Sequence, residues 1–215
     1  TKNKIIKIIA LVAVCAVAIS GFLMAQNRGS SRGGHKYVPY DQRTGEESIV
    51  YFTRNLSPEG LIQAYEKVDQ NIEGKIAVKL HTGERNGPNI IPSSWVKELV
   101  EESIPDATIV ETNTLYEGDR HTTRQHLKTL EVNGWTFCPV DILDSEDTLS
   151  LPLTGGKWFD KVSMGSHIVN YNSLVVLTHF KGHTQGGFGG SNKNIGIGCA
   201  DGKVGKYTLH SKVRA

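Results

Sequence analysis

The chain has 215 residues, enough for one domain with a single buried core, and its hydrophobic content of 38% is typical of a globular protein. Its formal net charge is +2, but Lys2, Lys4 and Lys7 lie in the first 25 residues, where no acidic residue occurs. The remainder carries 21 basic and 22 acidic side chains, a balance of −1. A body so close to neutral lacks the clustered positive charge on which nucleic-acid binding depends, so we exclude nucleic acid as a partner.

The first 25 residues are predicted to form an export signal or a membrane anchor. Residues 8–25 carry no charge, and a polar stretch follows them in residues 26–34. As a helix this run would rise about 27 Å, close to the roughly 30 Å hydrocarbon core of a bilayer. Lysines stay on the cytoplasmic side, so the domain is expected to lie outside the cytoplasm. We therefore expect an apolar helix in residues 1–25, a linker in residues 26–47 and the folded domain in residues 48–215.

Two other interpretations of the apolar run agree less well with the sequence. Lipid attachment at Cys15 needs a small residue before the cysteine, and Val14 stands there. A buried helix of the domain itself would leave the lysine flank and the Gly/Ser/Arg linker without a purpose. Export or anchoring is therefore the favoured interpretation.

The other cysteines, Cys138 and Cys199, are either a disulfide pair in an oxidising compartment or two separate buried thiols. The second reading is favoured, because free cysteine packs as a small hydrophobic residue. The chain contains no CxxC pair, so cysteine alone supports neither an iron–sulfur cluster nor a zinc site.

Strand and helix signals alternate along the folded part. Residues 48–53 (SIVYFT) are β-branched and aromatic, which favours a strand, and Ser57 and Pro58 form a helix-start signal. Gly134 ends a helical pattern, and residues 173–178 (SLVVLT) are typical of a strand buried on both faces. We predict strands at residues 48–53, 75–80, 107–111, 135–140 and 173–178, and helices at residues 57–69, 92–103 and 122–133.

This alternation predicts an α/β fold, with a mostly parallel sheet, right-handed crossovers and flanking helices in Rossmann-like layers. Residues 147–159 are expected to form an antiparallel excursion. In such sheets ligands bind beyond the carboxyl ends of the strands. That rule selects four loops, at residues 81–89, 113–121, 141–144 and 179–194.

The last of these loops, HFKGHTQGGFGGSNKN, is the strongest candidate for a ligand site. Its glycines let backbone amides approach a ligand, and residues 192–199 are a candidate helix after it. Histidine can exchange protons near neutral pH, and lysine can hold an anion or attack a carbonyl. A flexible turn is the alternative reading. The residues expected to bind a cofactor here are Lys193, Gly186, Gly187, Gly189, Gly190 and Asn194.

Further polar residues lie where the other loops begin. His81 follows the second predicted strand at once, and His121 lies near a helix start. Several side chains end or follow strands, where they either bind a metal or cap a turn: Glu111, Asn113, Asp141 and Asp144. His35, His126 and His167 are expected to be ordinary surface residues.

The segments VYFT, AVKLHTGE, ETNT, PVDI, LTHFKGHTQGGFGGSNKNIGIGCA and LHS, in this order, resemble the prokaryotic domain of unknown function 362 family, often labelled an uncharacterised iron–sulfur centre protein. The resemblance covers residues 48–211. Many members carry a ferredoxin-like cysteine segment after the domain, and this chain has none up to Ala215. We therefore expect a shortened relative or a chain without its C-terminal part, and we assign it no iron–sulfur cluster.

The stretch HTQGGFGGSNK is also similar to a histidine, glycine-rich and lysine stretch of nickel-pincer lactate racemase. There a lysine holds a pyridinium-derived cofactor, and histidines act as acid, base and nickel ligand. The resemblance implies that Lys193 is the tether, His183 and His121 transfer protons, and His210 binds the metal. Asn192 stands where the racemase pattern has arginine, which departs from that pattern.

Three functions remain open on these residues. The first is an enzyme or cofactor-binding domain with acid–base chemistry, to which we add Lys181 as a catalytic candidate. The second is a non-catalytic module at the membrane that binds a small molecule or a nickel, iron or zinc ion, with His179 and His81 as further ligands and Glu84 or Asp141 as carboxylates. The third is a truncated family member kept for interaction.

Overall fold

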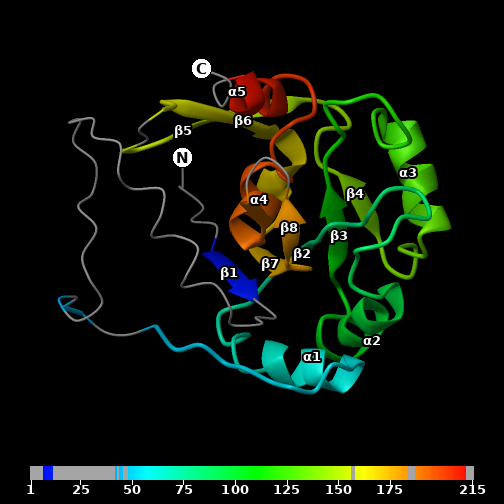
Figure 1. The fold of residues 1–215 in the computed structure, drawn as a ribbon, viewed down its shortest axis with the longest axis vertical. Helices are drawn as coiled ribbons and strands as arrows, with labels where there is room; N and C mark the ends of the chain where they lie inside the picture. Colours follow the sequence, from blue (N-terminus) through cyan, green and yellow to red (C-terminus); the bar gives the residue numbers. More distant parts are fainter. Residues whose placement is uncertain are drawn as a thin grey trace.

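The computed structural model describes residues 7–11, 42, 44–45, 48–155, 158–183 and 187–211, with the backbone alone for residues 7–11. A five-stranded sheet forms its centre (Figure 1). All strand pairs in this sheet are parallel, as the sequence predicts. Its strands, in spatial order, are β1 (Lys7–Leu11), β7 (Ser173–Leu177), β2 (Ile76–Lys79), β3 (Thr108–Glu111) and β4 (Val140–Ile142).

The strand order reverses between β2 and β7. The chain runs from β2 through β3 to β4 in one direction, and β7 then lies on the other side of β2. At such a reversal the connecting loops leave in opposite directions, which opens a crevice at the carboxyl ends of the strands.

Helices and small strands surround the sheet. Ser57 accepts a hydrogen bond from the Gly60 amide at the start of the first helix, as its N-cap signal predicts. That helix ends at Tyr65, earlier than the predicted residue 69. The helices are α1 (Pro58–Tyr65), α2 (Ser93–Ser103), α3 (Thr123–Val132), α4 (Ser191–Gly196) and α5 (Gly205–Ser211), with a 3-10 helix η2 (Ser166–Asn170). Two antiparallel pairs complete the fold, β5 (Thr148–Pro152) with β6 (Lys161–Gly165) and β8 (Lys181–His183) with β9 (Gly187–Gly189).

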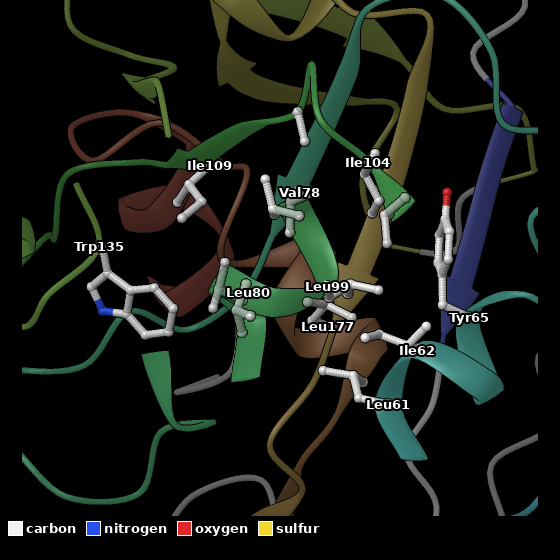
Figure 2. Close-up of a cluster of buried hydrophobic side chains, with 14 of the residues drawn as sticks. Leu61, Ile62, Tyr65, Val78, Leu80, Leu99, Ile104, Ile109, Trp135 and Leu177 are labelled. Carbon is white, nitrogen blue, oxygen red and sulfur yellow. The ribbon is translucent and has the colours of Figure 1, made fainter. Parts of the chain in front are cut away.

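Each face of the sheet has its own hydrophobic core. Figure 2 shows the first, in which Val78 and Leu80 meet side chains of α1 and α2. On the other face, alternate residues such as Ala77 and Val110 pack against β6, η2 and Cys199. Because these strands are buried on both faces, their sequences are nearly uninterrupted apolar runs.

One predicted strand is not a strand, and the strand predicted at residues 135–140 is displaced along the chain, since β4 begins only at Val140. Residues 48–53 form no strand and pair with none of the described strands, and Ile49 is 77% exposed. Within the described residues, the free edge of β7 is occupied by β1 instead. Residues 135–139 form turns instead of a strand. Pro139 has no amide hydrogen to donate to a neighbouring strand. The buried Trp135 is held in place by the hydrogen bond from its indole NH to Thr82 O.

The helix predicted for residues 1–25 is not present in residues 7–11, the part of this segment that the structure describes. Residues 7–11 are a strand, in register with residues 173–177 of β7, and two of them are the β-branched Ile8 and Ile9. Residues 12–25 and most of the predicted linker lie outside the described residues. No helix in the described part of the chain is long and apolar enough to cross a membrane.

Candidate ligand-binding cavity

A cavity of about 370 Å³ lies at the carboxyl ends of β2, β3 and β7, where the strand order reverses. It is lined by Lys79 and Glu111, the last residues of β2 and β3, and by Thr178, which follows β7. The rest of the wall comes from His81, from the loop after β3 (residues 112–120), from the histidine-rich loop of residues 179–190, and from α4, α5 and the residues that follow α4. Its ionisable lining residues apart from Tyr116 are Lys79, His81, Glu111, Arg120, His179, Lys181, His183, Lys193, Lys206 and His210.

A buried ion pair forms the floor of the cavity. Lys79 Nζ lies 2.8 Å from Glu111 Oε2 and also donates to Leu80 O and Asn194 Oδ1. Glu111 Oε1 accepts from the amide and hydroxyl of Thr82. Burial opposes ionisation of Glu111, but the charge of Lys79 holds the pKa of its carboxyl well below its usual range. Both charges are thus matched within the protein.

Gly198 and Asn194 fit closely around this pair. A Cβ on Gly198 would lie 2.7 Å from Lys79 Cε and would also overlap the Asn194 carbonyl oxygen, so only glycine fits. The Asn194 side chain donates to Leu177 O and Thr178 Oγ1. Asn194 therefore ties α4 to β7 and β2.

Three more lysines enter the cavity without a carboxylate partner among the described residues. Lys181 donates to Asn89 O, and Lys206 donates to Thr112 Oγ1 at 2.6 Å and to the carbonyl oxygens of Thr112 and Asn113. Burial lowers the pKa of Lys181 and of Lys193, and so do neighbouring cations, including Arg120 for both. Burial lowers the pKa of Lys206 to about 8. Burial and the neighbouring cations therefore both disfavour the charged form of these lysines.

Arg120 joins two of the predicted loops at the cavity wall. Its guanidinium donates to both carboxylate oxygens of Glu84 and to Tyr116 OH, and Tyr116 OH donates to Glu84 Oε1 at 2.6 Å. Arg120 is 6% exposed, whereas the Glu84 side chain is 52% exposed. Glu84 therefore holds Arg120 from the solvent side.

The histidines of the cavity differ in their surroundings. Burial lowers the pKa of His81 to about 4, and the nearby Lys181 and Arg120 add to this effect. At neutral pH this imidazole is uncharged. His179 Nδ1 is buried and has no hydrogen-bond partner in the described structure. His121 is exposed and does not line the cavity; its Nδ1 lies 3.2 Å from Thr114 O.

The cavity thus brings together most of the residues that the sequence singled out. Those that line it are His81, His179, Lys181, His183, Gly189, Gly190, Lys193, Asn194 and His210. Gly187 pairs with His183 in the β8–β9 hairpin but is not part of the wall, and Gly186 lies outside the described residues.

Several polar residues have structural surroundings that the sequence did not predict. His126 is completely buried, with neither ring nitrogen hydrogen-bonded in the part described, so the expectation of a surface residue is wrong. The same expectation for His167 also fails, because it is half-buried against Asp141 Oδ1 at 2.8 Å, and Tyr171 donates to Asp141 Oδ2. Asp144 accepts from the Asn113 and Gly202 amides, which is the turn-capping alternative.

The described residues contain no preformed metal site of the kind that the sequence led us to expect. Across the described ranges, no group of three or more His, Cys, Asp or Glu side chains is placed to hold a metal ion, although His81, His179 and His210 line one cavity. Cys138 and Cys199 are both free thiols, as the favoured interpretation predicts, but only Cys199 is fully buried.

Sequence reasoning missed Lys206 and Arg120. Arg120 follows a predicted strand by nine residues, and Lys206 lies on a short helix beyond the last predicted element. The only local signal for Lys206 is the GCADG turn before it. There Asp201 accepts hydrogen bonds from three successive backbone amides and so positions the start of α5.

The fold and the cavity define an α/β domain with a cationic, histidine-rich pocket at a reversal of strand order. The family model described as "Domain of unknown function (DUF362)" matches residues 76–215, more than half of the chain. The chain belongs to this family. No curated protein and no solved structure matches it.

Proposed function

We propose that this domain binds a small organic anion, carrying a carboxylate or phosphate group, in the cavity at the ends of β2, β3 and β7. One observation carries the proposal: Lys181, Lys193 and Lys206 enter one cavity with no carboxylate partner in the described structure. The acid on the cavity floor, Glu111, is already matched by Lys79.

Electrostatics supports an anionic ligand. Removing an ammonium group from water costs several kcal/mol unless an opposite charge compensates it. The lowered pKa values of Lys181, Lys193 and Lys206 reflect this cost and the repulsion from neighbouring cations, Arg120 in each case. An anion among them would offset both effects. A cavity of about 370 Å³ is at the small end of the range for ligand pockets, which suits a metabolite of a few carbon atoms.

Acid–base chemistry on that ligand is a second proposal, favoured by His81. Its imidazole is neutral at pH 7 and lies near Lys181 and Arg120, which would hold the anionic group; a bound anion would offset their charges and make His81 a stronger proton acceptor. His183 and His210 line the same cavity and offer further proton-transfer groups. Racemase-like exchange would use two such groups on opposite sides of one carbon. Neither a metal nor a cofactor tethered at Lys193 is part of this proposal.

Anion binding is tested by isothermal titration and thermal melting of the 215-residue chain with malonate and inorganic phosphate at constant ionic strength. Saturation at a hundredfold excess over Kd would stabilise the fold by about 2.7 kcal/mol. Lys193→Met should weaken binding at least tenfold. The matched control is Lys128→Met, because Lys128 is an exposed lysine of α3 with its own partner, Glu131. Equal responses of wild type and Lys193→Met, or none in wild type, would contradict the proposal.

Export or membrane anchoring is a separate proposal that depends on residues 1–25. It is supported by the lysines and the uncharged run in the sequence. Protease treatment of intact and lysed cells tests it, since an exported domain is cleaved without lysis of the inner membrane. Protection until the inner membrane is lysed would contradict it.

A further inference from the structure

Lys206 is the buried lysine of the cavity that has no acidic partner among the described side chains. It is 6% exposed, and its amino group donates to three neutral oxygens, Thr112 Oγ1 and the carbonyl oxygens of Thr112 and Asn113. The two acids whose charges act on it, Glu111 and Asp144, are engaged elsewhere, Glu111 with Lys79 and Asp144 with backbone amides.

Lys79 is a buried lysine of the same cavity that does have a carboxylate partner, and it serves as a comparison. Lys79 is 1% exposed, and its amino group is held by Glu111, Asn194 and a carbonyl oxygen, which together use its three protons. Lys206 lies in the same cavity and also donates to three oxygens, but no carboxylate among the described side chains compensates its charge. Burial and the charges of Lys79 and Arg120 lower the pKa of Lys206 to about 8. At pH 8 a substantial part of Lys206 is therefore the neutral amine, whereas an ordinary lysine is almost fully protonated. A neutral, desolvated lysine near other cations is the form that attacks carbonyl carbons.

The backbone around Lys206 holds it in place. Asp201 accepts from the amides of residues 203, 204 and 205, which sets the start of α5. A Cβ on Gly205 would overlap Ser163 O, so α5 packs directly on β6. His210 lies one helical turn after Lys206 on the same face of α5, and both line the cavity.

We propose that Lys206 forms an imine with a 2-oxo acid bound in this cavity. The inference rests on the proposed anion binding and names the ligand class for it. A 2-oxo acid carries a carboxylate, which the remaining cations Arg120, Lys181 and Lys193 can hold, directly beside a carbonyl carbon. The cavity therefore offers a charge site and a nucleophile for the two neighbouring groups of one small molecule.

Formation of the imine requires no reactant other than the Lys206 amine and the 2-oxo acid, and it releases one water molecule. The lone pair of the neutral Lys206 amine forms a C–N bond to the carbonyl carbon, and the C=O π pair moves to the oxygen, which takes a proton. Transfer of an amine proton to the resulting hydroxyl group then breaks the C–O bond and releases water, which leaves the C=N bond. His210, one turn along α5, is placed to move these protons. An imine of this kind withdraws electrons from the adjacent carbon and so assists loss of a proton there.

The test is reductive trapping. The 215-residue chain is incubated with pyruvate or 2-oxoglutarate and sodium cyanoborohydride at pH 8, and the product is analysed by intact mass and peptide mapping. One reduced adduct on the peptide that contains Lys206 is expected, at least tenfold above any other lysine. Lys206→Arg keeps a charge and donors but should abolish it. Lys203→Arg, an exposed neighbour, should not.

The wild-type peptide map decides the question even if the Lys206 variant folds poorly. An adduct on Lys181 or Lys193, or adducts scattered over exposed lysines, would overturn the assignment. If either oxo acid stabilises the fold but leaves no adduct, the imine is wrong while anion binding stands. If the oxo acids, malonate and phosphate all fail to bind, both proposals fail.

Discussion

Lys79 Nζ and Glu111 Oε2 lie 2.8 Å apart at the carboxyl ends of the neighbouring strands β2 and β3, with both side chains almost fully buried. This pair neutralises two charges of the cavity floor and leaves the other cations for a ligand. Removing one partner should therefore affect both the stability of the fold and the charge of the site.

Glu111→Gln should lower the free energy of unfolding by about 3–5 kcal/mol, because it leaves the Lys79 ammonium buried without compensation. Urea denaturation followed by circular dichroism measures this loss. The control is Glu131→Gln, which breaks the exposed pair with Lys128 and should change stability by less than about 1 kcal/mol. Similar small losses in both variants would show that the buried pair is not required.

Gly198→Ala should destabilise the fold by about 1–3 kcal/mol and weaken malonate binding, because the added methyl group would push Lys79 and α4 apart. The matched control is Gly196→Ala. A Cβ at Gly196 meets no atom within 4 Å, and alanine is the better helix former in α4. Thermal melts and titrations of both variants make the comparison; an unaltered Gly198→Ala protein would mean that α4 moves freely.

Glu84→Gln should raise the affinity for malonate by a few-fold, since an ion pair whose carboxylate is half-exposed contributes only about 1 kcal/mol. The substitution removes the negative charge that now engages Arg120, and so increases the positive potential of the cavity. Glu117→Gln is the control, because Glu117 is an exposed carboxylate of the same loop region. Isothermal titration that gives equal affinities for both variants would contradict this role of Arg120.

The affinity for malonate, which stays doubly ionised above neutral pH, should fall as the pH rises through about 8. Lys206 loses its proton in this range, and with it one positive charge of the cavity. Lys206→Arg should bind malonate without this decrease, because arginine stays charged. Titrations between pH 7 and 9.5 test both proteins. A decrease that persists in Lys206→Arg would have to come from another group.

His167 should stabilise the fold most at mildly acidic pH. Its hydrogen bond to Asp141 raises the pKa of His167 above its unfolded value. The stabilisation is therefore fully present below about pH 6.5 and is lost as the pH rises through the folded pKa. Melting temperatures of wild type and His167→Gln should differ more at pH 5.5 than at pH 8.5. A constant difference would indicate packing alone.

Local sequence patterns predicted the central strands of the sheet but not the position of its edge strands. The predicted strands at residues 75–80, 107–111 and 173–178 all contain real strands, since their apolar runs match burial on both faces. The run at residues 48–53 is also β-branched and apolar, yet it pairs with no edge of the described sheet and stays largely exposed. Whether a run of suitable residues pairs depends on an available edge, which composition does not encode.

The sequence by itself determined the parallel α/β order and, through the rule that ligands gather at the carboxyl ends of strands, the loop that carries His179, Lys181, His183 and Lys193. Tertiary structure alone decided that Lys79 is matched by Glu111 while Lys206 is not, and that His126 is buried. The reason is physical: periodicity reports which face of an element is apolar. The partner of a buried charge comes from residues 32 to 94 positions away along the chain, which only the packed fold brings within hydrogen-bond distance.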